Sequence, residues 1–199
     1  MAVLKAILTS LARRLGAPWA LGWLLLAVLG ASAGAAAPAD KPPSAEYQIK
    51  AAFLFNFAQF VEWPARAFRD AQGPIVIGIL GEDPFGSYLD DLVRNESVGG
   101  RPLAVRRFNR PEDITDCHIL FVSRAMADQF EKLAAELQRR NLLSVGDTDN
   151  FNRLGGIVRF VTENGKIRLR INMEAAKAAD LILSSKLLRW ATIVTPGKN

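Results

Sequence analysis

The chain has 199 residues, of which 25 are Lys or Arg and 20 are Asp or Glu, so its formal net charge is +5. Three of the basic residues and none of the acids lie in positions 1–39, and the remaining 22 basic residues against 20 acids give a net charge of only +2. A nucleic-acid-binding role, which needs a basic face on the folded domain, therefore loses its main support. The single cysteine, Cys117, excludes an internal disulfide.

Residues 1–39 are predicted to be a secretory signal peptide and its remnant. They combine basic residues near the start, an apolar run from Trp19 to Leu29, and small residues with cleavage patterns that end at Ala33 or Ala39. The alternative is an uncleaved anchor, but the apolar run is shorter than the ~20 residues that span a membrane. Cleavage leaves about 160 residues, enough for one domain with its own core. Residues 40–46 are interpreted as a linker, and residues 47–195 as the domain.

The middle of the chain alternates between predicted helices and strands. A helix is predicted over 44–63, where Pro64 ends it. The apolar run PIVIGIL at 74–80 has the length and pattern of a strand that is covered on both faces. Asp83 and Pro84 are predicted to cap and begin a helix over 84–94. The remaining expected elements are strands at 103–108, 118–122 and 142–145 and a helix at 124–140.

The pattern changes in the last third of the chain. Two alternating runs at 156–161 and 166–171 flank Asn164-Gly165, which is a strong signal for an antiparallel hairpin at one edge of the sheet. Asn172 is predicted to cap a final helix over 173–189. The fold class that follows is α/β, a single three-layer domain. A largely parallel central sheet ends in a C-terminal antiparallel hairpin, with helices on both faces.

The sequence offers few residues for catalysis. Cys117 and His118 are neighbours at the start of a predicted strand, so their side chains point to opposite faces and cannot act together. Because His118 is the only histidine, a clustered-histidine metal site is excluded. We therefore predict no catalytic, cofactor-binding or metal-binding residues, and a binding or regulatory protein rather than an enzyme that uses His118 as a base.

Two loops at predicted strand ends could form a small-molecule pocket. They contain Gly81 and Asp83 in the first, and Gly146, Asp147 and Asn152 in the second. The carboxyl ends of strands are where open α/β sheets usually bind ligands. The alternative, which the acidic residues and the lack of a phosphate-loop motif favour, is that these residues form turns and caps.

The segment FLFNFAQFVEW at 53–63 is the most aromatic stretch of the chain. On a helical wheel, Phe53, Phe57 and Phe60 fall on one apolar stripe that is interpreted as core, whereas Phe55 falls on the polar face and Trp63 on its border. The polar face lacks the Lys and Arg that a membrane-lying helix carries, so insertion of the mature chain in a membrane is not predicted. An aromatic residue on a polar face is instead typical of a protein interface.

Several ordered blocks give the chain a resemblance to the YfiR family of exported bacterial proteins. The resemblance extends from Tyr47 to about Val194. The blocks are KAAFLFNF (50–57), VEWP (61–64), ILGEDPFG (79–86), GRP (100–102), CHILF (117–121), FNRLGGI (151–157) with Phe160, IN (171–172) and SSKLL (184–188).

The resemblance implies a periplasmic α/β protein with no known catalytic activity. Well-studied relatives bind the periplasmic sensor region of an inner-membrane diguanylate cyclase and hold it inactive, until an outer-membrane, peptidoglycan-binding lipoprotein removes the repressor. Low cyclic-di-GMP then limits biofilm and exopolysaccharide output. Family members also tend to form homodimers, and the studied relatives carry disulfides, from which this chain departs because it has only Cys117.

Two regions are expected to meet a partner or a second copy. One is the back of the first helix, with Phe55, Gln59 and Trp63, and the other is the apolar end of the predicted last helix, with Leu187, Leu188 and Trp190. The competing function is that of a periplasmic small-molecule sensor whose pocket contains the residues of the two loops.

Overall fold

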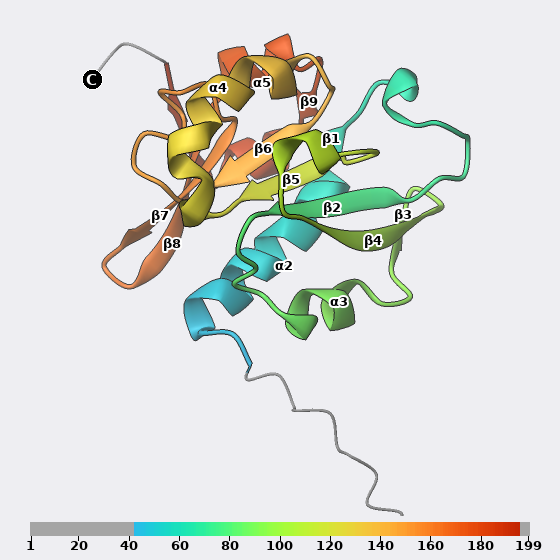
Figure 1. Cartoon of the computed structure of the whole chain (residues 1–199), viewed down its shortest axis with the longest axis horizontal. Helices are drawn as coiled ribbons and strands as arrows, with labels where there is room; N and C mark the ends of the chain where they lie inside the picture. The colour runs from blue at the N-terminus through green and yellow to red at the C-terminus, as the bar shows by residue number, and fades with distance from the viewer. Residues whose placement is uncertain (1–41, 196–199) are drawn as a thin grey trace, which may run out of the picture. The chain divides into compact units, whose positions relative to one another are not determined.

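The centre of the fold is an eight-stranded sheet with the strand order β10-β8-β7-β6-β5-β2-β4-β3. It is seen in a computed structural model that describes residues 42–195 (Figure 1). The predicted leader, 1–39, lies outside the described residues. The strands of the sheet are β2 (Ile75–Leu80), β3 (Ser97–Val98), β4 (Arg101–Phe108), β5 (Ile119–Val122), β6 (Leu143–Gly146), β7 (Val158–Glu163), β8 (Lys166–Asn172) and β10 (Ala191–Val194).

The sheet is mostly parallel and confirms the predicted fold class. Strand β2 pairs in parallel with β4 on one side and β5 on the other, and β6 and β7 continue the parallel part. Strands β7 and β8 form the predicted antiparallel hairpin. Because β2, the first strand of this sheet along the chain, lies in its interior and later strands extend the sheet in both directions, the direction of winding reverses between β2 and β5.

Helices cover both faces of the sheet and give the three layers (Figure 1). Helix α2 (Ala45–Phe60) and helix α3 (Ser87–Val93) share one core cluster with the residues of β2 that face them, Ile75, Ile77 and Ile79. Helix α4 (Ala127–Gln138) packs on the opposite face, where Leu80 and Leu120 belong to a second cluster. All six residues of β2 are buried, as the uninterrupted apolar run predicts.

Helix α2 ends three residues before its predicted end. Val61–Glu62 form the short strand β1, which pairs antiparallel with β9 (Ile182–Leu183), and the amide of Ser184 donates to the carbonyl of Phe60. These contacts with a segment more than 100 residues away compete with the last helical turn. Trp63 therefore lies outside the helix on which it was placed.

The predicted helix over 173–189 is wrong. The segment contains α5 (Met173–Ala178), strand β9 and α6 (Ser185–Leu188), and β10 follows. The side chain of Asn172 caps α5 as expected, but Asp180 adopts a left-handed conformation with φ of 57° and stops any continuation. Strand β10 then pairs in parallel with β8, so β10 and not the hairpin forms this edge of the sheet.

The predicted start of the helix over 84–94 also needs correction. Asp83 is not its N-cap, because α3 begins at Ser87 after Gly86, whose φ is 54°. Asp83 instead accepts hydrogen bonds from the amides of Phe85 and Gly86, at 2.7 and 3.2 Å, and so stabilises the turn that precedes the helix.

Candidate functional site

An apolar groove lies between α2 and the segment around α6. Its walls are Phe53, Phe57 and Phe60 of α2 on one side and Leu187 and Trp190 on the other, with Asn56 as its polar member. The groove has a volume of about 310 Å³. Trp190 is 76% exposed, the highest value among the exposed large apolar residues of the described segment. A surface of this kind is typical of a contact with another molecule.

The core of the domain holds the α2 side of the groove in place. The rings of Phe53 and Phe57 pack against Phe160 of β7, with centroid distances of 5.9 and 6.1 Å. The amide nitrogen of Asn56 donates to the carbonyl of Ala52 within the helix, at 2.7 Å. The groove is therefore preformed, and a ligand or partner would meet aromatic surface whose rotamers are already restricted.

The six residues expected at a partner surface have different environments. Leu187 is buried and, with Trp190, belongs to the groove, while Gln59 is exposed on α2. Phe55, Trp63 and Leu188 are half-buried and pack against the main core. The indole nitrogen of Trp63 donates to the carbonyl of His118 at 3.2 Å, so this residue holds a loop against the sheet.

The helical pattern of the sequence predicts that Phe53, Phe57 and Phe60 belong to the core alone. Phe57 is fully buried, but Phe53 and Phe60 are half-buried and line the groove. Ile49, which falls beside Phe53 and Phe60 on a helical wheel, is 47% exposed. The buried residues of α2 are Lys50, Ala51, Leu54, Phe57 and Ala58. The buried face therefore overlaps the predicted stripe at Phe57 but is rotated away from Phe53 and Phe60.

A buried ionic cluster connects α2 with the carboxyl end of β6. Lys50, which is 1% exposed, places its ammonium nitrogen 2.6 Å from Asp147 Oδ2 and 2.6 Å from Glu46 Oε1. The hydroxyl of Tyr47 donates to Asp147 Oδ2 at 3.2 Å, and Arg124 Nε lies 3.2 Å from Asp147 Oδ1. The sequence signal for this cluster is weak. On a helical wheel, Lys50 lies among the apolar residues of its helix instead of on the polar face.

The charges in this cluster alter the ionisation of its members. Burial opposes the ionisation of Asp147, but the cations of Lys50 and Arg124 outweigh it and lower the pKa of this carboxyl. Burial and the negative charge of Asp147 raise the pKa of Tyr47 to about 12. Asp147 is therefore an ionised, internally paired carboxylate rather than a free ligand for a small molecule.

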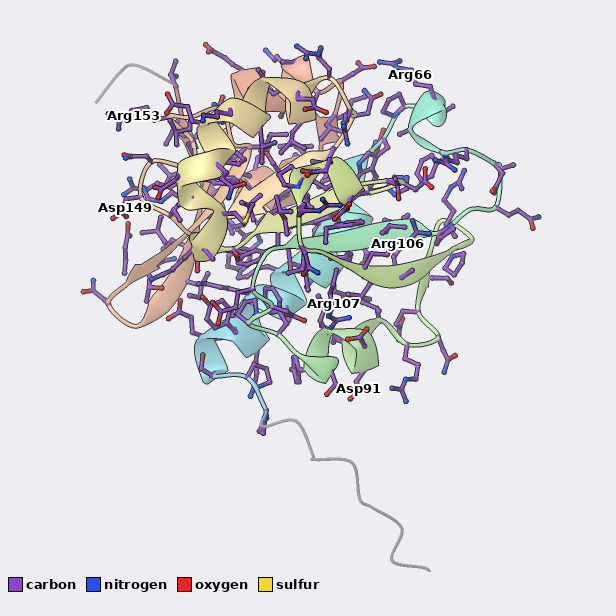
Figure 2. The ribbon with its side chains drawn as sticks, in the orientation of Figure 1. Arg66, Asp91, Arg106, Arg107, Asp149 and Arg153 are labelled. Carbon is purple, nitrogen blue, oxygen red and sulfur yellow. The ribbon has the colours of Figure 1, made fainter. Side chains whose placement is uncertain are left out.

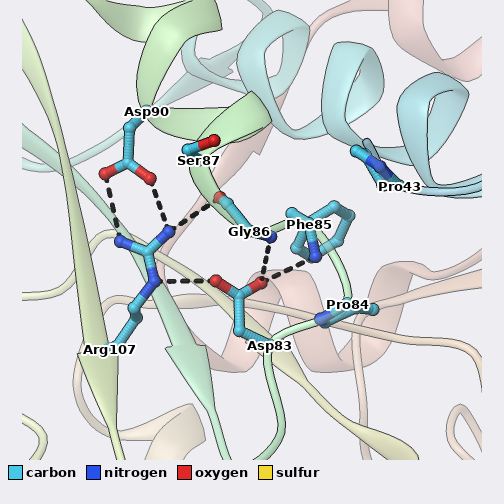
Figure 3. A pocket seen from close by; sticks show the side chains of 8 residues that line it. All are labelled: Pro43, Asp83, Pro84, Phe85, Gly86, Ser87, Asp90 and Arg107. Carbon is cyan, nitrogen blue, oxygen red and sulfur yellow. Dashed lines mark hydrogen bonds and ion pairs between the residues drawn. The ribbon is translucent and has the colours of Figure 1, made fainter. Parts of the chain in front are cut away.

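Asp83 lines a different hollow, with a volume of about 620 Å³, near the N-terminal end of α3 (Figure 3). Arg107 of β4 donates to Asp83 at 2.7 Å, to both carboxylate oxygens of Asp90, and to the carbonyl of Gly86 at 2.9 Å. The hydrogen bond to Asp90 is the main reason why the pKa of Arg107 is raised. Since its donors are already engaged, Arg107 is poorly placed to receive an added anion.

The other residues of the predicted pocket have internal contacts. The side chain of Asn152 donates to the carbonyls of Ile157 and Gly156, at 3.0 and 3.2 Å. A Cβ atom on Gly146 would lie 2.5 Å from the ring of Phe151, and one on Gly81 would lie 2.5 Å from Ser123 Oγ. These glycines are required for close packing. Asp83 belongs to the cluster around Arg107 and Asp147 to the cluster around Lys50, so the predicted residues do not form one pocket.

Cys117 and His118 lack the environment of catalytic residues. Burial lowers the pKa of His118 to about 4 and raises the pKa of Cys117 to about 12, so neither is suited to proton transfer or nucleophilic attack near neutral pH. His118 Nδ1 accepts from the amide of Val76 at 3.1 Å, and its ring stacks on Phe68 with a centroid distance of 4.5 Å. Both residues are therefore structural.

Charged groups at the surface are mixed in sign and distributed around the domain. In Figure 2 the labelled side chains of Asp149 and Arg153 lie at the left of its outline, Arg66 at the upper right and Asp91 at the lower right. Asp149 pairs with Arg159, and Arg66 pairs with Asp180. Within residues 42–195, no group of three or more His, Cys, Asp or Glu residues is arranged to hold a metal ion. None of the helices in this part of the chain has the length and apolarity needed to cross a membrane.

Comparison with known families finds a match that covers most of the described residues. Residues 47–192, which include every residue of the groove, match the family described as YfiR/HmsC-like. The chain belongs to the YfiR/HmsC-like family. A search of curated proteins finds no match to the chain.

The YfiR/HmsC-like family consists of periplasmic regulatory proteins, linked to the control of diguanylate cyclases, and is not a family of enzymes. The sequence blocks that suggested this assignment have structural roles here. Lys50, in the first block, is the buried lysine of the ionic cluster. Arg101, in the block GRP, places its guanidinium 3.7 Å from the centroid of Phe68, which in turn stacks on His118. These blocks maintain the fold that presents the groove.

Proposed function

We propose that this YfiR/HmsC-like protein is exported to the periplasm and represses an inner-membrane diguanylate cyclase by binding its periplasmic sensor region. Repression lowers cyclic-di-GMP and reduces biofilm and exopolysaccharide output. An outer-membrane, peptidoglycan-binding lipoprotein relieves it by removing the repressor, which acts as a homodimer. The observation that carries the proposal is the family match over residues 47–192.

The groove between α2 and α6 is the surface we assign to the cyclase. Its walls are aromatic and aliphatic, its α2 side is held rigid by Phe160, and Trp190 projects at its rim. Large aromatic residues that bury well-defined surface dominate the energetics of protein interfaces. Exposed Gln59, also on α2, is assigned to the polar surroundings of the same contact.

Deletion of the gene is expected to raise cellular cyclic-di-GMP, and the wild-type gene should restore the low level. A gene that encodes Trp190→Ser should fail to restore it, because loss of an interface aromatic costs about 2 kcal/mol, or roughly 30-fold in affinity. Trp190 is 76% exposed, so the substitution should leave folding intact. Cyclic-di-GMP measured by mass spectrometry tests this expectation.

Ile49→Ser is the matched control, since Ile49 is also an exposed apolar residue, at 47%, but does not line the groove. This variant should repress as well as the wild-type protein. An unchanged cyclic-di-GMP level after gene deletion would contradict the proposed function. Full repression by Trp190→Ser would contradict the assignment of the groove alone.

The second candidate is a periplasmic small-molecule sensor. The hollow of about 620 Å³ beside Asp83, after the carboxyl end of β2, favours this function. A ligand that binds the native state raises the melting temperature by mass action, so a thermal-shift screen with the purified protein tests it. Asp90→Asn, at the rim of the hollow, should weaken any such shift.

A further inference from the structure

The two edges of the sheet differ in how they are protected. Strand β3, at one edge, has only two residues and turns directly into β4. Strand β10, at the other edge, has four residues, of which three are β-branched and none is charged, Gly or Pro. Folded proteins normally protect an edge with short strands, Lys, Pro or a bulge, because unpaired backbone groups invite pairing with another chain. Strand β10 has the properties of an edge that is paired in the working protein.

The open edge carries exposed apolar side chains. Two of the four exposed large apolar residues in the described segment lie there, Trp190, which directly precedes β10, and Ile193 within it, at 76% and 49%. Ile193 lies opposite Ile171 of β8, and residues opposite one another in adjacent strands share a face of the sheet. Since Ile171 belongs to the core cluster that α2 covers, Ile193 extends the apolar α2 face to the edge.

We propose that β10 pairs with β10 of a second copy of this chain, antiparallel, about a twofold axis at Thr192. The inference rests on the homodimer that forms part of the proposed function, and it names the surface that builds that dimer. A twofold axis normal to the sheet keeps the same face of both copies on the same side of the joined sheet. Two residues that lie opposite each other must therefore both point their side chains to that same face. A register centred on Thr192 meets this requirement.

In this register the strand is complementary to itself. Thr192 lies opposite Thr192 of the second copy, and a threonine pair across antiparallel strands is favourable. Ala191 lies opposite Ile193 of the second copy, and by symmetry Ile193 lies opposite Ala191 of the second copy. Each of these pairs matches a small side chain with a large one. No pair brings like charges together. This self-complementarity is the reason to assign a second copy, rather than an unrelated strand, to the edge.

The pairing also has a consequence for the groove. Both copies present their α2 faces on the same side of the joined sheet, so the two grooves lie on one surface. Trp190, which directly precedes β10, stands at the inner rim of each groove. The dimer therefore offers two copies of the same binding surface side by side, which suits a partner that is itself twofold symmetric.

Thr192→Lys tests the axis position. Thr192 is exposed in the single chain, so the substitution should not affect folding, but it places two ammonium groups opposite each other in the dimer. The protein purified from periplasmic extracts should sediment as a dimer, and Thr192→Lys as a monomer. Ser97→Lys, at the exposed β3 edge, is the control and should remain a dimer. A mixture of Thr192→Lys with Thr192→Glu should recover the dimer, since opposite charges then face each other.

Thr192→Cys tests the register by cross-linking. Directly opposed residues in antiparallel strands have Cα atoms about 4.5–5.5 Å apart, which is within the range that a disulfide spans. Mild oxidation should give a covalent dimer that reducing agent separates. Thr162→Cys, on the exposed part of β7, should give none.

A monomeric wild-type protein, a Thr192→Lys variant that stays dimeric, or a Thr192→Cys variant that does not cross-link would each overturn the proposal. If the wild-type protein is a monomer but binds another protein, and Thr192→Lys abolishes that binding, the edge would be assigned to that other protein instead. These outcomes are separate from the cyclic-di-GMP level of the deletion strain. Failure of the regulatory function would leave the dimer standing. A monomeric wild-type protein would remove the homodimer from the proposed function but would leave repression of the cyclase to be tested by the cyclic-di-GMP level.

Discussion

Replacement of Lys50 by Met should destabilise the protein by about 3–5 kcal/mol, because it leaves the buried carboxylate of Asp147 without its closest cation. The side chains of Lys50 and Asp147 are each 1% exposed. Arg124 still contacts Asp147, but at 3.2 Å and from a side chain that is 66% exposed. A domain of this size has a total stability of about 5–15 kcal/mol, so the loss is a large fraction of the total.

Urea unfolding followed by tryptophan fluorescence measures the effect as a shift in midpoint at constant slope. Lys186→Met is the control, because Lys186 is exposed on α6 and its replacement should change stability by less than about 0.5 kcal/mol. The double variant Lys50→Met with Asp147→Leu removes both charges and should recover part of the loss. A Lys50→Met variant within 1 kcal/mol of the wild type would contradict the role assigned to the cluster.

Acidification should weaken the fold through His118. Burial lowers the pKa of this imidazole to about 4 in the folded protein, whereas in the unfolded chain it has the ordinary value near 6.5. Between these two values the unfolded chain binds a proton that the native state does not bind. Stability therefore rises with pH across this window and is lost as the pH falls from about 6.5 to about 4, by roughly 2 kcal/mol at pH 5.

Urea unfolding at pH 7.5 and at pH 5.0 gives this difference directly. The His118→Asn variant keeps an acceptor near the amide of Val76 but cannot titrate, so its stability should change less between the two pH values. It should also be less stable at pH 7.5, because the stacking of His118 on Phe68 is lost. Equal losses in the two proteins on acidification would show that another group causes the pH dependence.

The buried central strand and the hairpin of the sheet could be predicted from sequence patterns within short segments. Strand β2 is apolar throughout because both of its faces are covered, and Asn164-Gly165 joins β7 to β8 with the left-handed conformations that such a turn requires, with φ of 50° and 71°. These features depend on neighbours along the chain, so they can be predicted without the tertiary structure.

The C-terminal segment could not be predicted in this way. Its leucines and lysine favour a helix locally, but Leu183 pairs with Val61 and Ala191 pairs with Leu169. Strand pairing with distant residues outweighs a helix propensity that is worth less than about 1 kcal/mol per residue. The same long-range packing decides which part of α2 stays uncovered, and so creates the groove.

The fold class and the resemblance to regulatory proteins of the YfiR type could be predicted from the sequence alone, because both depend on periodicity and on local motifs. The contact of Lys50 with Asp147, the groove that Phe53 and Phe60 line with Trp190, and the open edge at β10 could be found only in the folded structure. The physical reason is that these features arise between segments up to about 140 residues apart, where burial and pairing, rather than local propensity, set the conformation.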